Sequence, residues 1–138
     1  MITLVGTKDK FLEICDKVDL VKGVRLTQEK LYKLLVASIY HPGVFALKSI
    51  EDGKMNGCMV LLSGVDQLGE KVVSLVFVWI DAHYPKLHNK FIEQAVDTGK
   101  FVGATRLSIQ TDKAEKVINR RLGKFGFKQA CCIYEKVI

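Results

Sequence analysis

The chain has 138 residues, of which 49% are hydrophobic and 26% are charged, and its formal net charge at pH 7 is +6. These values predict one globular domain over residues 1–138 and exclude a low-complexity or repetitive chain. No apolar run approaches the roughly 20 residues of a membrane span, so we expect no membrane partner and a cytoplasmic location. The excess of Lys and Arg favours an anionic partner, such as a phosphate-rich cofactor or a nucleic acid.

The first forty residues predict a short edge strand, Ile2–Val5, followed by two helices. Thr7 and Thr27 are placed to cap them, because a threonine hydroxyl can accept a hydrogen bond from the first helical turn. Four apolar residues lie at helical spacing on the first helix: Phe11, Ile14, Cys15 and Val18. The second helix is expected to end at His41-Pro42-Gly43.

The middle of the chain predicts three antiparallel strands. Val44–Ile50 and Gly57–Ser63 flank Glu51-Asp52-Gly53-Lys54, a hairpin turn in which glycine is free to adopt a positive φ. A longer turn, Gly64–Glu70, then leads to Val72–Ile80, which has no charge and no turn former. A run of that kind is typical of a strand covered on both faces.

The second half alternates helices and strands. A helical pattern starts near Lys86, and Thr105–Gln110 is a short strand after it. Apolar residues at helical spacing then extend to Phe125, Gly126 closes that helix, and Phe127–Val137 is the last strand. Because a strand–helix–strand connection makes parallel neighbours, residues 72–80 and 105–110 should pair in parallel. We therefore expect an α/β or α+β fold with a mixed sheet.

The four cysteines, Cys15, Cys58, Cys131 and Cys132, form no C-x-x-C pair. We expect reduced and mostly buried thiols in an intracellular protein, rather than a disulfide framework or a metal site.

The order of elements resembles that of the GNAT superfamily of acyl-CoA N-acyltransferases. Leu122–Lys128, LGKFGFK, is similar to the family's Y-x-x-x-G-F helix end, where Gly126 would supply the left-handed residue. Ile80–Tyr84, IDAHY, is similar to the V-D-P-x-Y end of the family's fourth strand. The resemblance implies a central mixed sheet with an antiparallel meander, splayed parallel fourth and fifth strands, and helices on both faces.

The resemblance also implies how acetyl-CoA would bind. Backbone groups near Val78 and Ile80 would hold the pantetheine arm between the splayed strands. The pyrophosphate would lie at the next helix start, in a loop of the form Q/R-x-x-G-x-G/A. The aligned residues here are Pro85-Lys86-Leu87-His88-Asn89-Lys90.

This loop departs from the family pattern at both glycines. His88 and Lys90 replace them, and a side chain there can block the approach of a phosphate to bare backbone. Lys86, His88 and Lys90 could supply side-chain charge instead, with Asn89 between them. A second departure is Leu122, which stands where many members have a tyrosine that protonates the leaving thiolate.

Asp81 and His83 follow the central strand and are candidate general bases for deprotonating an amine. The alternative is that Asp81 caps the turn and His83 is solvated. Tyr84 and Tyr134 could donate a phenolic proton in place of the missing tyrosine. Alternatively, both lie at the edge of the core, with the ring buried and the hydroxyl exposed to solvent.

Lys113, Lys116, Arg120 and Lys124 recur at spacings of three, four and four, which places them on one helical face. A bound polyanion would relieve their mutual repulsion, and it could be the 3′-phosphate of CoA or a nucleic-acid backbone. A solvated basic face is the alternative.

The leading hypothesis is transfer of an acyl group, acetyl in the first place, from CoA to an amine, with weakened affinity for the cofactor. One rival is a catalytically silent GNAT-like module that serves as a binding or structural protein. The other is a nucleic-acid-associated protein that uses the basic face.

Compact GNAT-like proteins are carried by bacteriophages as well as by bacteria. A phage origin would place this protein in the virion or the host cytoplasm.

Overall fold

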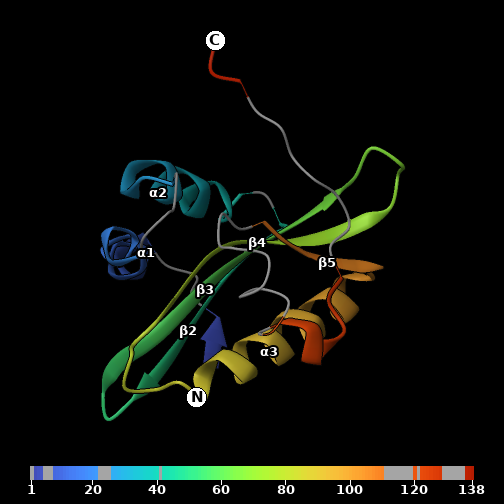
Figure 1. Cartoon of the computed structure of the whole chain (residues 1–138). Helices are drawn as coiled ribbons and strands as arrows, with labels where there is room; N and C mark the ends of the chain where they lie inside the picture. Colours follow the sequence, from blue (N-terminus) through green and yellow to red (C-terminus); the bar gives the residue numbers. More distant parts are fainter. Residues whose placement is uncertain are drawn as a thin grey trace.

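The computed structural model describes residues 2–4, 8–21, 26–40, 42–110, 120, 122–128 and 136–138. At its centre the described residues form a sheet whose five strands follow chain order across the sheet (Figure 1). They are β1 (Ile2–Leu4), β2 (Val44–Glu51), β3 (Lys54–Val65), β4 (Lys71–Ile80) and β5 (Arg106–Ile109). The first four pair antiparallel, and β5 pairs parallel with β4. The expected mixed sheet with an antiparallel meander is confirmed.

Helices cover both faces of this sheet (Figure 1). The α1 helix (Lys8–Cys15), the 3-10 turn η1 (Val18–Leu20) and α2 (Gln28–Ala37) lie on one face, and α3 (Leu87–Val102) lies on the other. The predicted cap of α2 is present, since Thr27 Oγ1 accepts from the N–H of Lys30 at 3.2 Å. The α3 helix ends at Gly103, whose φ of 77° is the left-handed conformation that glycine favours.

Strand alternation divides the buried core into two layers, because successive side chains point to opposite faces of the sheet. Cys58 and Val60 pack with α1 and α2, whereas Met59 and Leu61 pack with α3. All four apolar residues predicted to face the core from the first helix are buried: Phe11, Ile14, Cys15 and Val18. The last of these lies in η1, because α1 itself ends at Cys15.

The hairpin between β2 and β3 turns on Asp52 and Gly53, whose φ values are 51° and 75°. Positive φ at both central residues gives the twist that a two-residue hairpin needs. The pairing shifts between Ser49, opposite Gly57, and Ile50, opposite Met55. Asn56 is therefore an extra residue on β3, a β-bulge that the sequence pattern did not reveal.

The fifth strand borders only the first half of β4. Paired residues run from Val72 with Arg106 to Leu75 with Ile109. Residues 76–80 of β4 continue past the last of these pairs, and none of the described strands borders them on this side. The prediction that residues 72–80 and 105–110 are parallel neighbours is confirmed.

Near the C-terminus the structure tests the predictions at a few residues. The expected helix end is confirmed, since the 3-10 turn η2 (Gly123–Phe125) stops at Gly126 with a φ of 85°. The described ends of the predicted strand Phe127–Val137, residues 127–128 and 136–137, are in no strand. Both predicted bounds are therefore wrong, and at the first of them the left-handed Gly126 turns the chain just before residue 127. The rest of that strand, most of the preceding helix and the predicted cap Thr7 lie outside the described residues.

Candidate active site

Asp81, the residue after β4, organises the turn that leads into α3. Its backbone N–H donates to the carbonyl oxygen of Asn56 at 2.8 Å, which ties the turn to β3. Its Oδ1 accepts from the backbone N–H of His83 at 2.9 Å and lies 2.8 Å from His83 Nδ1. The hydrogen bond from the His83 backbone N–H is the largest of the contacts that lower the pKa of Asp81 below its ordinary value of 3.8. At neutral pH Asp81 is therefore a charged carboxylate in contact with an imidazole.

The other two candidate catalytic residues lie in the same turn. The side chain of His83 is 89% exposed, so it is open to solvent on every side except the one facing Asp81. Tyr84 is half-buried against the α3 layer, and its backbone N–H donates to the carbonyl of Asp81 at 3.0 Å. The turn-capping role expected for Asp81 is thus present, and the same turn holds an acid–base pair. Tyr134 lies outside the described residues.

The free edge of β4 presents backbone groups of Val78 and Ile80. In a strand the N–H and C=O groups of successive residues point to alternate sides. Because the N–H of Asp81 points to Asn56 on β3, the groups of Ile80 point away from β3, and so do those of Val78. They face the side that β5 leaves open. The two residues predicted to hold a pantetheine arm therefore have backbone groups directed to the open side of β4, and their contact with such an arm stays a prediction.

The first turn of α3 lies directly beyond this edge. Leu87 is buried against the sheet, whereas Lys86, His88, Asn89 and Lys90 are exposed. Lys86 precedes the helix and makes no side-chain cap. The four residues predicted to meet the pyrophosphate thus share one solvent-exposed helix start, where backbone N–H groups and the helix dipole favour an anion.

Two hollows flank the end of β4. One, of about 550 Å³, runs along Val78, Ile80 and Ala82 and reaches Leu20 and Val21 at the end of η1. The other, of about 800 Å³, lies between the α1–η1 segment, the β2–β3 hairpin and the turn at Asp81. Trp79 and Asp81 line both, so the two hollows adjoin the same end of the strand.

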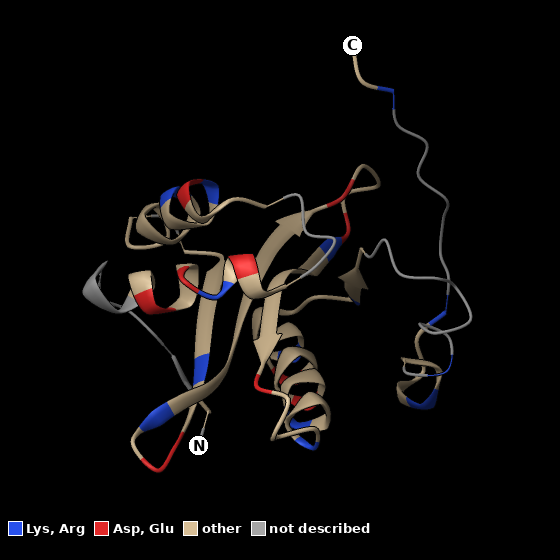
Figure 2. Cartoon of the chain, turned by 60° about the vertical axis from the view of Figure 1, so that its left-hand side comes forward, with Lys and Arg blue, Asp and Glu red and all other residues tan. Residues whose placement is uncertain are grey.

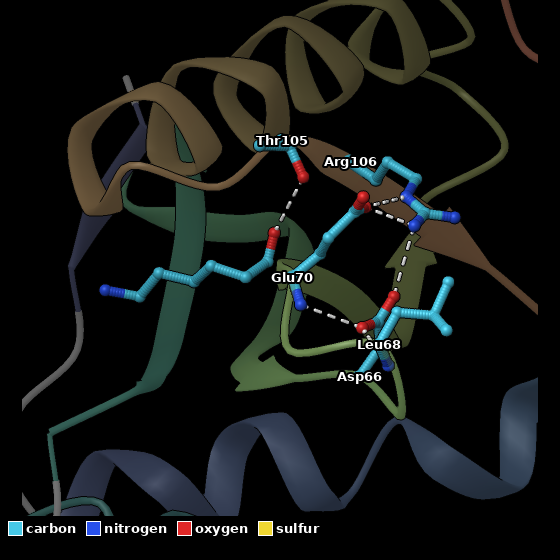
Figure 3. A network of polar contacts seen from close by, with 6 residues as sticks. Asp66, Leu68, Glu70, Thr105 and Arg106 are labelled. Carbon is cyan, nitrogen blue, oxygen red and sulfur yellow. Dashed lines mark hydrogen bonds and ion pairs between the residues drawn. The ribbon is translucent and has the colours of Figure 1, made fainter.

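The opposite end of β4 is fixed by a polar network around Arg106 (Figure 3). Arg106 Nε donates to Glu70 Oε2 at 2.9 Å, and a terminal nitrogen contacts both Glu70 and Asp66, the latter at 3.2 Å. The Glu70 carboxylate raises the pKa of Arg106, so the guanidinium stays charged. Asp66 Oδ1 also accepts from the N–H groups of Leu68 and Glu70, each at 2.9 Å. The β3–β4 turn is therefore held to the start of β5.

The described cysteines carry no reactive thiolate. Cys15 and Cys58 are both free and buried. Burial raises the pKa of the Cys58 thiol to about 12, and it raises the pKa of Cys15 as well. A protonated thiol is a poor nucleophile, so neither residue is suited to forming a covalent intermediate. Cys131 and Cys132 lie outside the described residues.

The predicted basic face is described only in part. Arg120 and Lys124 are exposed, and Lys124 Nζ lies 5.2 Å from the ring centre of Phe125. Lys113 and Lys116 lie outside the described residues, so the polyanion contact stays a prediction. Among the described helices, none is both long and apolar enough to cross a membrane.

Comparison with solved structures defines the class of fold. The chain matches a probable acetyltransferase with a TM-score of 0.76 at 16% identity, covering 100% of this chain and 97% of the other. It matches AAC(6')-Iy, in complex with the bisubstrate analogue CoA-S-monomethyl-acetylneamine, with a TM-score of 0.78 at 13% identity over 100% and 98%. It also matches the ribosomal-protein-alanine N-acetyltransferase from Brucella melitensis, with a TM-score of 0.74 at 10% identity over 100% and 99%.

The chain therefore has the GNAT acetyltransferase fold, as the sequence motifs implied. No family model matches the sequence, and no curated protein matches it either. At these identities the likeness establishes the fold, while the chemistry must be argued from this chain's own residues.

Sequence reasoning missed the residues on the other side of the larger hollow. Glu13, Glu51 and Asn56 line it, and none was a candidate site residue. Asn56 gave the only available signal, as a polar residue at the start of an otherwise apolar strand. Its significance depends on the bulge and on burial, which a single sequence does not show.

Proposed function

We propose that the protein is an acyl-CoA-dependent N-acyltransferase that transfers an acetyl group to an amine. The observation that carries this proposal is the free edge of β4, where Val78 and Ile80 present backbone groups directly before the exposed start of α3. The GNAT fold supports the proposal, since a solved structure of the same fold holds a CoA bisubstrate analogue.

Backbone geometry would supply most of the catalysis. A strand N–H at the open edge polarises the thioester carbonyl, and the two hollows bring donor and acceptor together. The amine nitrogen attacks the carbonyl carbon, a C–N bond forms and the C–S bond breaks. The amine must lose one proton and the departing thiolate must gain one. No covalent intermediate on the protein is needed, which suits a site whose described cysteines are protonated.

Residues of the turn after β4 carry out the two proton transfers. Asp81 orients the ring of His83 through Nδ1, which leaves Nε2 on the solvent side to take a proton from the incoming ammonium. Tyr84 follows Asp81 by three positions, so its phenol takes the role of proton donor to the thiolate that Leu122 cannot fill. Lys86, His88, Asn89 and Lys90 would meet the pyrophosphate with side chains as well as backbone.

Calorimetric titration of the full chain with acetyl-CoA tests this proposal, and we expect it to show binding. In a separate thermal-unfolding experiment, the melting temperature should rise with acetyl-CoA concentration. Replacing His88 and Lys90 together by glycine should tighten binding, because phosphate then reaches bare backbone, at a helix-propensity cost of roughly 1 kcal/mol per glycine. The matched control places glycine at Glu93 and Asp97, exposed positions farther along α3.

The missing loop glycines favour one rival, a GNAT-like protein without catalysis. In that case the side chains of His88 and Lys90 occupy the phosphate space. Millimolar acetyl-CoA would then leave the melting temperature of the wild-type chain unchanged, and this result would contradict the enzyme proposal.

A further inference from the structure

The smaller hollow, at the open edge of β4, is lined almost entirely by apolar residues. Leu20 and Val21 contribute to it from the end of η1, and the last residues of β4 contribute from the sheet. The β4 strand carries no charged residue from position 72 to position 80, so its ribbon is tan there in Figure 2. Trp79 adds an aromatic ring to the lining. A ligand in this hollow therefore meets mainly hydrocarbon.

The exposure of these residues favours a ligand with apolar surface. Leu20 is 61% exposed, although its side chain is large and apolar. Val21, Val78, Trp79 and Ile80 are half-buried. Apolar groups are stabilised when they are removed from water, and one ligand in the hollow would cover several of them together. The volume of about 550 Å³ lies within the range of roughly 300–1,000 Å³ that is usual for small-molecule sites.

Asp81 is the only charged residue among the described residues that line this hollow. Its side chain is 35% exposed, so a ligand can reach it. Both of its contacts with His83 engage Oδ1, and they leave Oδ2 to a ligand. A single carboxylate at the end of an apolar lining is complementary to a molecule with one positive charge and an apolar body.

The larger hollow has a different character, since six charged residues line it. Lys17 and Lys54 lie among its four carboxylates and compete with any cation for them. An apolar body there would remove charged groups from water, which is unfavourable. Of the two hollows beside Asp81, the smaller one therefore suits an amine with an apolar body.

We infer that the smaller hollow binds the acyl acceptor, and that this acceptor is a primary amine with one ammonium group and an apolar body of several carbon atoms. The assignment of acceptor rests on the proposed acyltransferase function. The ammonium group lies at Asp81 and gives one proton to the adjacent His83 before its nitrogen attacks the thioester carbonyl. The apolar body lies against Leu20 and Trp79, which makes these two side chains determinants of acceptor specificity.

Calorimetric titration of the full chain with hexylamine tests this inference, because hexylamine joins one ammonium group to an unbranched apolar chain. Methylamine keeps the charge without the apolar body, and 1-hexanol keeps the apolar body without the charge. The wild-type chain should bind hexylamine more tightly than either. The difference from methylamine should be about tenfold or more, since each buried methylene contributes a factor of roughly four.

Leu20→Ala should weaken hexylamine binding by about fivefold, because it removes apolar contact. Methylamine binding should not change, since the variant removes no charge. Leu12→Ala is the matched control, because Leu12 is a leucine on α1 that is 53% exposed and is not among the lining residues of either hollow. This control should bind hexylamine as the wild-type chain does. Melting temperatures of both variants separate a loss of binding from a loss of folding.

Three results would overturn the inference: no hexylamine binding by the wild-type chain with or without added CoA, hexylamine binding no tighter than that of methylamine or 1-hexanol, or an equal loss in both leucine variants. If Leu20→Ala weakens the binding of acetyl-CoA and not that of hexylamine, the hollow holds the cofactor arm and the inference is also overturned.

A parallel titration with acetyl-CoA keeps the two proposals apart. If acetyl-CoA binds and hexylamine does not, the acceptor class is wrong and the acyltransferase proposal stands. If hexylamine binds and acetyl-CoA does not, the hollow is an amine site, and its role as an acceptor site is overturned together with the acyltransferase proposal.

Discussion

At the scale of single residues, Asp81 makes the contacts that organise the turn after β4. One carboxylate caps the turn, orients His83 and lines both hollows. Because its contacts favour the charged form, its pKa lies below the ordinary value of 3.8. A structural role and a chemical role therefore coincide in one side chain, and the two can be separated by measuring stability apart from activity.

The first prediction concerns the pH dependence of stability. In the range just below 3.8 the unfolded chain binds a proton at Asp81 that the folded chain does not, so this contribution to stability rises with pH and is lost as the pH falls through the folded-state pKa. Asp81→Asn removes the contribution. The free energy of unfolding of this variant should therefore decrease less, as the pH falls, than that of the wild-type chain. Urea unfolding at a series of pH values from 6 down to 3 is the measurement.

The control for this experiment is Asp97→Asn, which removes an exposed carboxylate from α3. If both variants keep the acid limb of the wild-type chain, Asp81 makes no such contribution to folding.

At the scale of elements, the start of α3 is positioned by a glycine on the neighbouring sheet. A Cβ atom at Gly57 would lie 2.7 Å from Leu87 Cδ2 and 2.7 Å from Phe91 Cε2. Both side chains are buried, so neither can turn outward to make room. The absence of a side chain at Gly57 therefore sets how closely the helix that carries the proposed phosphate site approaches β3.

We predict that Gly57→Ala lowers the free energy of unfolding by about 1–3 kcal/mol, the usual cost of overpacking a filled core. It should also weaken acetyl-CoA binding, because the first turn of α3 must shift. Chemical denaturation measures the first effect and calorimetry the second. Gly64→Ala is the matched control on the same strand, since a Cβ there meets nothing within 4 Å. Equal stability of the two variants would contradict this account of the helix position.

At the scale of the whole molecule, the Arg106 network joins parts of the chain that are distant in sequence. Arg106 binds Glu70 and Asp66, which lie 36 and 40 residues earlier. The network lies at the end where β4 and β5 are paired, and the two candidate hollows lie at the other end. It therefore adds side-chain contacts to the pairing of β5 with the first half of β4, beyond which residues 76–80 have an open edge.

Arg106→Ala should loosen this pairing without unfolding the rest of the sheet. We expect severalfold faster hydrogen exchange of the β5 amides and of the adjoining amides of β4, with little change in β2. Arg106→Lys should rescue only part of the protection, because an ammonium group cannot make the two-nitrogen contact of a guanidinium. Lys128→Ala removes an exposed positive charge elsewhere and serves as the control. Unchanged exchange in β5 would show that backbone pairing alone holds the strand.

The local sequence was sufficient for most of the fold. The apolar run of residues 72–80, the Thr27 cap, the Asp52-Gly53 turn and the stop at Gly126 each express a preference of the backbone itself, and all four are present in the structure. The sequence also placed the candidate residues Asp81, His83 and Tyr84 in one turn, because they follow a recognisable strand within four positions, and the structure has them there.

Only the tertiary structure decided where the open edge and the larger hollow lie. The direction of the Ile80 backbone groups follows from one hydrogen bond between Asp81 and Asn56, and the place of Asn56 follows from a bulge in the ladder. Glu13 and Glu51 are 38 positions apart, and folding alone brings them to one hollow. Neither periodicity nor composition records such long-range contacts. The sequence by itself therefore determined the elements and their order, and packing between distant segments decided which side chains share a site.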